Sequence, residues 1–446
     1  MWLPLSFLLV LGFGVWLLLL TEQQRHSKPP EKLLTANPQG FIFGEYRRFL
    51  RKPQFFYKSE DTDGHILIIG GSGSGKTSSI LLPSFPALRS TKFVIDVKGE
   101  IAAATAHLPG RRKIFNPMSA ASFGYDPYYR LRGSDNPMQE AKEIAQILIP
   151  EPPNLKDPFW VRATQKLVTG FMLHYCNEGV SFADTMIEIV RRPIDLHVKD
   201  VLAVTGSTPA QYCLNGFVRK PERLDDFYTE LTNEIMLFAT DERVKALLCK
   251  PENISPLDLE EDCDVFLCVP EDKIDQWRPL TNLIINQFFK HFERRPEKTA
   301  KPITFIFEEA PRFGKYESVA TGLNTLRSKN IIMCLIAQSL AQFDMIYGEA
   351  QRKTIFDNCT YQAILGARDA DTQEYFSRLV GTREVTRQGQ STNYAPDKDE
   401  ERGHTVSQHI IDQRIIQPHE FTTLKDVVLL SPWGYHRAGK IRPVVG

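Results

Sequence analysis

The segment GGSGSGKTSS covers Gly70–Ser79 and directly follows the apolar run HILII at 65–69. It fits the pattern G-x-x-x-x-G-K-[ST], in which glycines allow a tight turn whose backbone N–H groups point at phosphates. Lys76 would reach the β- and γ-phosphates, and the Thr77 hydroxyl would bind Mg²⁺. The β-rich run before the segment and the helix-competent SSILL after it favour this cradle over a flexible Gly/Ser loop. The predicted site for ATP with Mg²⁺ comprises Gly70, Gly71, Ser72, Gly73, Ser74, Gly75, Lys76, Thr77 and Ser78.

Short apolar runs recur along the chain and predict the strands of one sheet. They are separated by longer, helix-competent segments, a spacing typical of a parallel sheet with helices on both faces. The predicted strands are 65–69, 92–97, 264–269, 303–307, 331–337, 361–365 and 426–430. The predicted fold class is therefore α/β with a mainly parallel sheet.

The region 155–260 interrupts this alternation. Its apolar residues recur with the helical period, most clearly at 160–175 and 182–190, and no convincing strand is found there. We therefore predict a nucleotide-binding domain in two parts, 61–154 and 261–446, with 155–260 inserted between them as an all-α domain.

The N-terminal residues 2–20, WLPLSFLLVLGFGVWLLLL, carry no charge. As a helix they would span about 28 Å, close to the thickness of the hydrocarbon core of a bilayer. No basic segment precedes them and no small-x-small cleavage motif follows, which favours a retained anchor over a cleaved signal peptide. Because basic residues follow the run at 25–32, the bulk of the chain is predicted to be cytoplasmic.

Two further segments have compositions that predict irregular structure. Residues 22–60 are polar and contain several prolines, so we predict a linker between a single-pass anchor over 1–21 and the soluble part. Residues 386–410 are mostly polar and predict a mobile loop.

Charge and cysteine content restrict the remaining possibilities. Lys plus Arg and Asp plus Glu both total 54, so any contact with nucleic acid must come from a local patch or from inside an assembly. The seven cysteines show neither a disulfide framework nor metal-binding spacing, and a reducing compartment fits them.

An acidic pair, Glu308 and Glu309, ends the apolar run ITFIF. In open parallel sheets ligands bind at this end of the strands. Neighbouring residues in a strand point in opposite directions, but beyond the last ladder bond both can turn toward a site. Glu308 would coordinate Mg²⁺, and Glu309 would polarise the attacking water. The alternative is an acidic pair that only caps a strand at the surface.

Three other polar positions could complete an ATPase. Gln338 ends the run IIMCLIA, where its amide could bind water or the γ-phosphate. Asp96 ends a strand in FVIDVKGE, where a simple turn is the alternative. Arg327 precedes a predicted strand, and a guanidinium from a neighbouring subunit can stabilise a transferring phosphoryl group, although a solvated arginine is equally common there.

Taken together, these segments resemble the coupling proteins of type IV secretion systems, the TraG/TraD-like ATPases of conjugative DNA transfer. The resemblance covers most of the chain after residue 60. It rests on the order and spacing of HILIIGGSGSGKTSSILLP, FVIDVKGE, DPFW, ITFIFEEAPRFGK, TLRSKNIIMCLIAQSLAQFDMIYG, NCTYQAILGARDADTQEYFSRLVG and RIIQPHEF. Among these, DVKGE, IAQSLAQ and DADTQEYFS are far more specific than the phosphate loop.

The resemblance implies a RecA-like P-loop motor domain with an all-α insertion, tethered in the bacterial inner or plasma membrane. It implies a homohexamer with nucleotide between subunits, acting on DNA, relaxosome nucleoprotein or protein substrates together with channel proteins. By position, Lys76 and Thr77 match the phosphate-loop pair and Glu309 the catalytic carboxylate. Gln338 matches the glutamine that senses the γ-phosphate, and Arg327 the arginine finger.

The chain departs from this family pattern in two respects. Most members have Asp at the position of Glu308, so the Mg²⁺-binding arm here is one methylene longer, and most have two membrane spans where one is expected here. A chromosome-segregation-type DNA pump is one alternative, for which a further C-terminal DNA-reading module is expected. Another is a nucleotide-binding membrane adaptor that recruits protein substrates through 155–260 with little or no DNA pumping. ATP turnover and its stimulation by DNA would discriminate among these functions.

Overall fold

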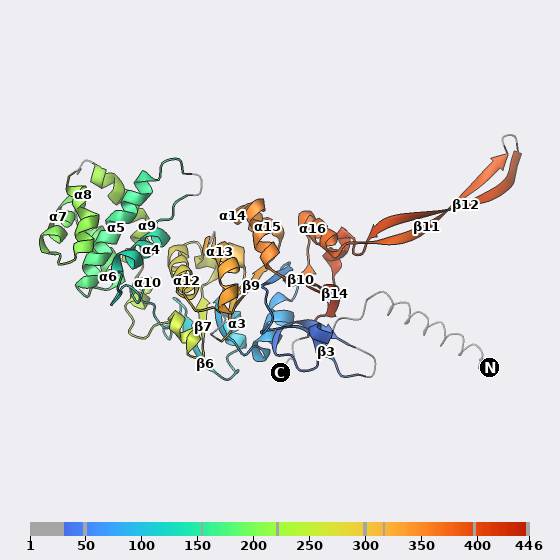
Figure 1. The fold of residues 1–446 in the computed structure, drawn as a ribbon, viewed down its shortest axis with the longest axis horizontal. Coiled ribbons are helices and arrows are strands. Elements are labelled where there is room, and N and C mark those ends of the chain that lie inside the picture. Colours follow the sequence, from blue (N-terminus) through green and yellow to red (C-terminus); the bar gives the residue numbers. More distant parts are fainter. Residues whose placement is uncertain are drawn as a thin grey trace.

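The computed structural model describes residues 31–47, 51–152, 155–219, 223–297, 301–314, 317–395 and 398–442. The predicted anchor over 2–20 lies outside these ranges. Within them, none of the helices combines the length and the hydropathy needed to cross a bilayer. The molecule is elongated, with a helical unit at one end, the sheet in the middle and a two-stranded ribbon at the other end (Figure 1).

Twelve strands of the described residues form one sheet in the order β1-β3-β2-β14-β13-β10-β4-β9-β8-β5-β7-β6. From β10 to β6 every neighbouring pair is parallel. These parallel strands are β4 (Ile66–Gly70), β5 (Thr91–Asp96), β6 (Arg111–Phe115), β7 (Cys263–Cys268), β8 (Ile303–Phe307), β9 (Ile331–Ala337) and β10 (Tyr361–Gly366). The predicted α/β fold with a mainly parallel sheet is thus confirmed.

Burial on both faces explains why these strands are apolar without alternation. In β4, Leu67 and Ile69 pack into one hydrophobic cluster, and Ile66 and Ile68 into the cluster on the other face. All four side chains are fully buried, and each contributes about 1.5–3 kcal/mol to folding. A parallel strand covered by helices on both sides therefore needs an unbroken apolar run.

The rest of the sheet is antiparallel, and it corrects the linker predicted over 22–60. The described part of that segment forms β1 (Leu34–Thr35), β2 (Gly40–Tyr46) and β3 (Gln54–Ser59). With β13 (Asp426–Ser431) and β14 (Gly434–Gly439), these strands extend the sheet beyond β10. The predicted strand 426–430 is thus present, but it pairs antiparallel to β10. Two of the prolines that suggested a linker are described, Pro38 and Pro53, and both lie between strands, where they remove no ladder bond.

Helices connect and cover the parallel strands. They are α2 (Leu82–Ser84), α3 (Glu100–Ala104), α11 (Pro256–Glu260), α12 (Arg278–Glu293), α13 (Glu317–Thr325), α14 (Leu340–Tyr347), α15 (Glu349–Asn358) and α16 (Ala370–Val380). Short helical turns complete this set: η1 (Glu31–Leu33), η2 (Lys76–Leu81), η3 (Phe85–Ala87), η5 (Glu271–Lys273), η6 (Ala310–Phe313), η7 (Arg327–Lys329) and η8 (Pro418–Thr423).

A purely helical unit leaves the sheet between β6 and β7, as the pattern over 155–260 predicts. It consists of α5 (Phe159–Asn177), α6 (Phe182–Arg191), α7 (Ile194–Val204), α8 (Thr208–Val218), α9 (Leu224–Thr240) and α10 (Glu242–Leu248). The described residues of this region form no strand. The domain boundaries themselves remain a prediction.

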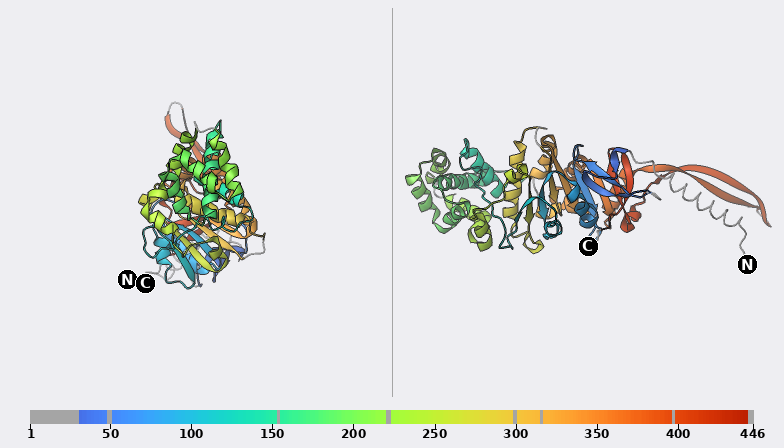
Figure 2. Two further views of the ribbon diagram at one scale, coloured as in Figure 1. Left: turned by 90° about the vertical axis from the view of Figure 1, so that its left-hand side faces the viewer. Right: turned by 90° about the horizontal axis from the view of Figure 1, so that it is seen from below.

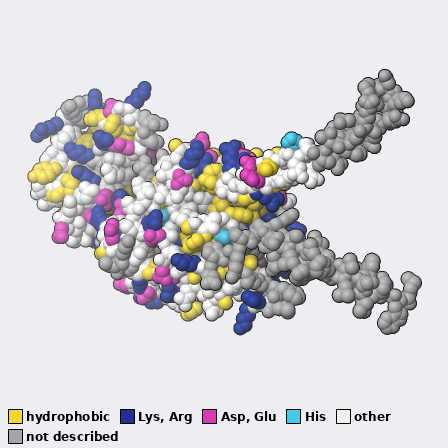
Figure 3. All heavy atoms as spheres, turned by 45° about the vertical axis from the view of Figure 1, so that its right-hand side comes forward, with side chains coloured by type: hydrophobic (Ala, Val, Ile, Leu, Met, Phe, Trp, Pro, Cys, Tyr) yellow, Lys and Arg dark blue, Asp and Glu magenta, His cyan; other side chains and the backbone are white. Residues whose placement is uncertain are grey.

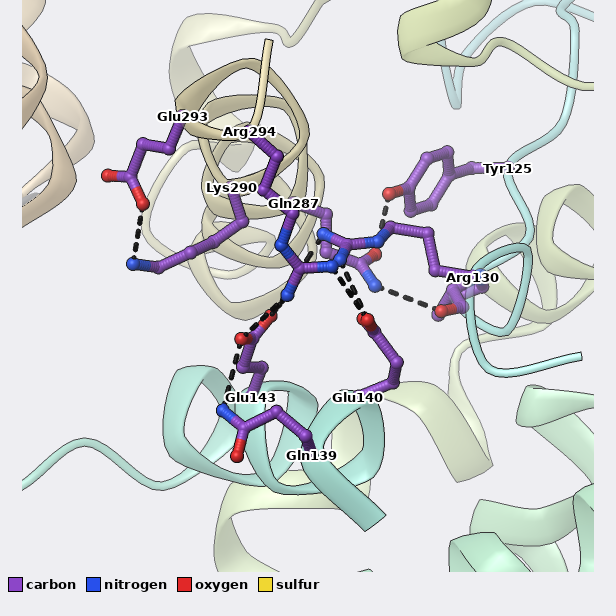
Figure 4. A network of polar contacts seen from close by, with 10 residues as sticks. Tyr125, Arg130, Gln139, Glu140, Glu143, Gln287, Lys290, Glu293 and Arg294 are labelled. Carbon is purple, nitrogen blue, oxygen red and sulfur yellow. Dashed lines mark hydrogen bonds and ion pairs between the residues drawn. The ribbon is translucent and has the colours of Figure 1, made fainter. Parts of the chain in front are cut away.

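An ionic joint fixes the helical unit to the core (Figure 4). α4 (Pro137–Leu148), which packs against α5, presents Glu140 and Glu143 to α12. The guanidinium of Arg294, at the end of α12, contacts Glu140 at 2.7 Å and Glu143 at 3.0 Å. Arg130 contacts Glu140 from the loop before α4, at 2.8 Å. Because Glu140 and Arg130 are nearly buried, salt screens this joint less than it would a surface ion pair.

The segment 386–410, predicted to be a mobile loop, belongs instead to the ribbon β11 (Thr382–Ala395) and β12 (Lys398–Arg414). Among the described strands, these two pair only with each other. Composition alone gave no strand signal here, because none of the ribbon residues whose burial is described is buried, and ladder hydrogen bonds hold the two strands together.

Candidate nucleotide-binding site

Apart from Arg327, the predicted site residues come from neighbouring strands at one edge of the sheet. In the order β4-β9-β8-β5, the phosphate loop follows β4, Gln338 follows β9, Glu308 and Glu309 follow β8, and Asp96 ends β5. Since these strands are parallel, their carboxyl ends lie at the same edge. Segments more than two hundred residues apart in sequence therefore meet within one protomer.

The phosphate loop has the backbone conformation that its glycines permit. Gly75 immediately precedes η2 and has φ 97°, in the left-handed region that a side chain disfavours. At Gly71 and Gly73 a Cβ atom would meet nothing within 4 Å, so the space over the loop is open. The enclosed hydroxyl of Ser74 has no hydrogen-bond partner among the described residues. An open cradle with an unsatisfied hydroxyl fits a phosphate group.

Lys76 folds back over this loop. Its ammonium donates to the carbonyl oxygen of Gly70 at 2.6 Å and lies 3.9 Å from Oε1 of Glu309. The side chain is only 8 % exposed, and burial lowers its pKa, while the nearby carboxylates of Glu309 and Glu308 oppose that shift. The charge of Lys76 is thus held where the outer phosphates of a nucleotide would lie.

Glu308 links the phosphate loop to β5. Its Oε1 accepts a hydrogen bond from the Thr77 hydroxyl at 3.2 Å, and its Oε2 accepts one from the Val97 N–H at 3.3 Å. Burial raises the pKa of Glu308 to about 7, and the nearby Asp96 adds to this shift. Asp96 is fully buried, and burial raises its pKa as well. Two carboxyl groups therefore lie in a space where a divalent cation would lower the cost of their charge.

Glu309 can face the same site as Glu308 because its backbone is left-handed. Its φ of 52° and ψ of 45° are uncommon for a residue with a side chain, and such strained positions cluster at functional sites. Its carboxylate accepts hydrogen bonds from the Gln338 amide at 3.2 and 3.3 Å. The turn thus directs one carboxylate toward Thr77 and the next toward Lys76 and Gln338.

Supporting contacts hold Gln338 in place. Its N–H donates to the Gln342 side chain at 2.9 Å, and the Leu340 N–H donates to the Thr372 hydroxyl at 3.0 Å. Thr372 in turn donates to Asp369 at 2.5 Å. The motifs IAQSLAQ and DADTQEYFS therefore meet behind the glutamine, where they fix the start of α14.

Sequence reasoning missed Lys440. This residue follows β14, and its ammonium donates to the carbonyl oxygens of Ser74 at 2.9 Å, Leu365 at 3.2 Å and Leu424 at 3.5 Å. The ammonium group of Lys440, which follows the C-terminal strands, thus stabilises the phosphate loop through a hydrogen bond to its backbone. A single lysine with no surrounding motif gave no signal for this role.

Arg327 does not lie with the other predicted residues. It belongs to η7, at the start of β9, whereas Gln338 follows the end of that strand. A seven-residue strand is about 23 Å long, so Arg327 is at the opposite edge of the sheet. Its guanidinium contacts Asp63 at 3.2 Å, and the side chain is 55 % exposed. It cannot serve the phosphate loop of its own protomer.

Comparisons with known proteins agree with this geometry. The family model for conjugative DNA transfer of the type IV secretory system matches residues 20–430. The chain belongs to this family. VirD4 of Rhizobium rhizogenes is 22% identical over 356 residues, which cover 76% of this chain and 52% of that protein. TraG of Escherichia coli is 21% identical over 374 residues, covering 76% of this chain and 58% of that protein.

The chain thus spans little more than half the length of these curated relatives. Among solved structures, the conjugative coupling protein TrwB in its sulphate-bound trigonal form has a TM-score of 0.66 at 16% identity. That similarity covers 94% of this chain and 90% of that one. TrwB with a non-hydrolysable ATP analogue gives a TM-score of 0.65, also at 16% identity, over 95% of this chain and 91% of that one. At this identity the likeness establishes the fold alone.

Proposed function

We propose that the chain is a membrane-anchored, Mg²⁺-dependent ATPase that couples DNA or nucleoprotein to a type IV secretion channel. The observation that carries the proposal is the convergence of the phosphate loop, Glu308, Glu309 and Gln338 at one edge of the sheet. Family membership supports the context of conjugative DNA transfer. TrwB structures with an ATP analogue and with ADP and Mg²⁺ support the choice of nucleotide and metal.

The residues present fit these ligands. Thr77 and Glu308 would hold Mg²⁺, which prefers oxygen ligands and is usually bound by one or two carboxylates plus substrate phosphates. Bound there, Mg²⁺ would neutralise charge on the phosphate oxygens. Lys76 would move its hydrogen bonds from loop carbonyls to phosphate oxygens. Glu309 would orient the attacking water, and Gln338, which already bonds to Glu309, would report whether the γ-phosphate is present.

In a ring of identical subunits, the neighbouring subunit would supply the arginine that stabilises the transferring phosphoryl group. Arg327 is exposed at the sheet edge opposite its own phosphate loop, a position from which it could reach only a neighbour's site. We therefore propose a homohexamer in the bacterial inner or plasma membrane, with Arg327 as the arginine finger. On the face seen in Figure 3, basic and acidic side chains are interspersed, which fits DNA contacts confined to the inside of such a ring.

The test is ATP hydrolysis by the full chain in detergent, with and without DNA. We expect turnover that DNA increases several-fold. The adaptor alternative, in which ATP binds but is hardly hydrolysed, would follow if the longer side chain of Glu308 held Mg²⁺ poorly. ATP binding without turnover would support the adaptor, and turnover that DNA leaves unchanged would indicate protein recruitment.

The pKa of Glu308 also predicts a pH dependence. Because only the carboxylate binds Mg²⁺, protons compete with the metal below the pKa of about 7. The Mg²⁺ concentration for half-maximal hydrolysis should rise about tenfold per pH unit as pH falls below 7, and should level off above about 8. Mg²⁺ titrations across this range test the prediction, and a Glu308→Gln variant should lose the dependence.

The same pKa also affects folding stability. Without Mg²⁺, Glu308 is more protonated in the folded than in the unfolded chain between about pH 4.5 and 7, so this group favours folding increasingly as pH falls.

A further inference from the structure

The ribbon β11–β12 projects away from the body of the molecule (Figures 1 and 2). Its strands have 14 and 17 residues and form a separate two-stranded sheet. At its base the Ile415 N–H donates to the Gly381 carbonyl at 3.1 Å, and Arg414 contacts Glu374 at 2.8 Å. An isolated two-stranded ribbon is marginally stable in water, and both of its edges carry unpaired backbone groups. A partner that covers such a ribbon would stabilise it.

One face of the ribbon base is basic. Directly opposed pairs share a face, and here Val385 lies opposite Ile411 while Arg387 lies opposite His409. Two residues before Val385, on the same face, lies Arg383. The side chains of Arg383, Arg387 and His409 are exposed, and none has an ion-pair partner within 4 Å among the described residues. We call this surface the basic face; it has an apolar centre with basic groups around it.

The other face is acidic. Glu384 lies directly opposite Asp412, and Thr386 opposite Ile410, which is 69 % exposed. Two like charges in a directly opposed pair destabilise an isolated ribbon. Neither carboxylate has an ion-pair partner within the described part of the chain. We call this surface the acidic face; an exposed isoleucine lies at its centre.

We propose that the basic face of one ribbon packs on the acidic face of the ribbon of a second copy of this chain. The apolar centres, Val385 with Ile411 on one side and Ile410 on the other, would be buried together. The surrounding charges of opposite sign would then compensate the like-charge pairs of each isolated ribbon. Because the two faces differ, the contact is head-to-tail, the kind of interface that repeats around a closed ring.

The opposite charges of the two faces favour the ribbon of a second copy over nucleic acid as the partner. A nucleic acid could cover the basic face alone and would be repelled by the acidic face, whereas a second ribbon satisfies both faces. The ribbon contact rests on the ring of subunits in the proposed function, but it does not require ATP hydrolysis. The two ideas can therefore fail separately.

The test compares the full chain and its charge-reversed variants in detergent, without nucleotide, by mass photometry over a range of concentrations. An acid-reversed variant, Glu384→Lys with Asp412→Lys, has two basic faces; a base-reversed variant, Arg383→Glu with Arg387→Glu, has two acidic faces. Each should self-associate at least about tenfold more weakly than the natural chain. An equimolar mixture of the two, and a variant that carries all four changes, should each regain association.

Binding of a fluorescent ATP analogue serves as the control for folding, since all these variants should retain it. If the natural chain fails to bind the analogue, the proposed function fails, and the ribbon contact is still judged by its own readout. The ribbon proposal is overturned if the natural chain does not self-associate or if the charge reversals leave association unchanged. It is equally overturned if only the base-reversed variant is impaired, loses binding to a DNA oligonucleotide and is not rescued by the additional acid reversal.

Discussion

Replacing Lys76 with alanine should lower ATP turnover by about a hundredfold or more, because a positive charge placed for the outer phosphates is lost. In the free protein the Lys76 ammonium is hydrogen-bonded to the Gly70 carbonyl and lies close to Glu309. The ammonium group is therefore already in position, and these partners offset part of the cost of burying it. Phosphate release by the full chain in detergent, with and without DNA, measures the effect.

Lys92 offers a matched control. It is buried to the same extent as Lys76, with 8 % of each residue exposed, and its ammonium also donates to a backbone carbonyl, that of Ser90, at 2.8 Å. However, Lys92 lies in β5 near its start, at the sheet edge away from the site. Lys92→Ala should lower the free energy of unfolding while turnover per folded molecule stays unchanged. Unchanged turnover in Lys76→Ala would contradict the assignment of the phosphate loop.

The composition of this site was predictable because parallel strands have a simple geometry. The carboxylates and Gln338 come at the end of apolar runs, and the carboxyl ends of parallel strands share one edge, so these residues could be placed together, whereas Arg327 precedes its strand and lies at the other edge. The left-handed backbone of Glu309, which lets two neighbouring carboxylates face the site, could not be predicted from the sequence. The sequence also does not show that Lys440 reaches the phosphate loop, because that contact depends on the antiparallel pairing of β13 with β14.

The strands that are buried on both faces were predictable, because each of them contains an unbroken apolar run in the sequence. β6 was missed because it is an edge strand: its residues Arg111 to Lys113 are basic, and only Phe115 is fully buried. The strands of the predicted linker were missed because polar residues and prolines separate them. The ribbon was missed because none of its residues with a described burial, 382–388 and 407–414, is buried in one protomer. If a second copy covers it, its stability depends on a partner that one sequence pattern cannot reveal.

Replacing Glu309 with glutamine should leave ATP binding nearly unchanged and lower turnover about 10²- to 10⁴-fold. The amide has almost the same shape, so the left-handed turn and a hydrogen bond to Gln338 can persist, but it cannot accept a proton from water. Binding of a fluorescent ATP analogue and phosphate release, measured on the same sample, separate the two effects.

Glu308→Gln is the informative control, because it changes the adjacent carboxylate in the same way. That side chain contacts Thr77 and not Gln338, so its loss should chiefly raise the Mg²⁺ concentration needed for hydrolysis. Glu309→Gln should leave that Mg²⁺ requirement unchanged and stay slow at saturating metal. If the two variants behaved alike, the division of roles between the carboxylates would be wrong. If Glu309→Gln hydrolysed ATP at the natural rate, neither the catalytic role nor a motor driven by this site could be maintained.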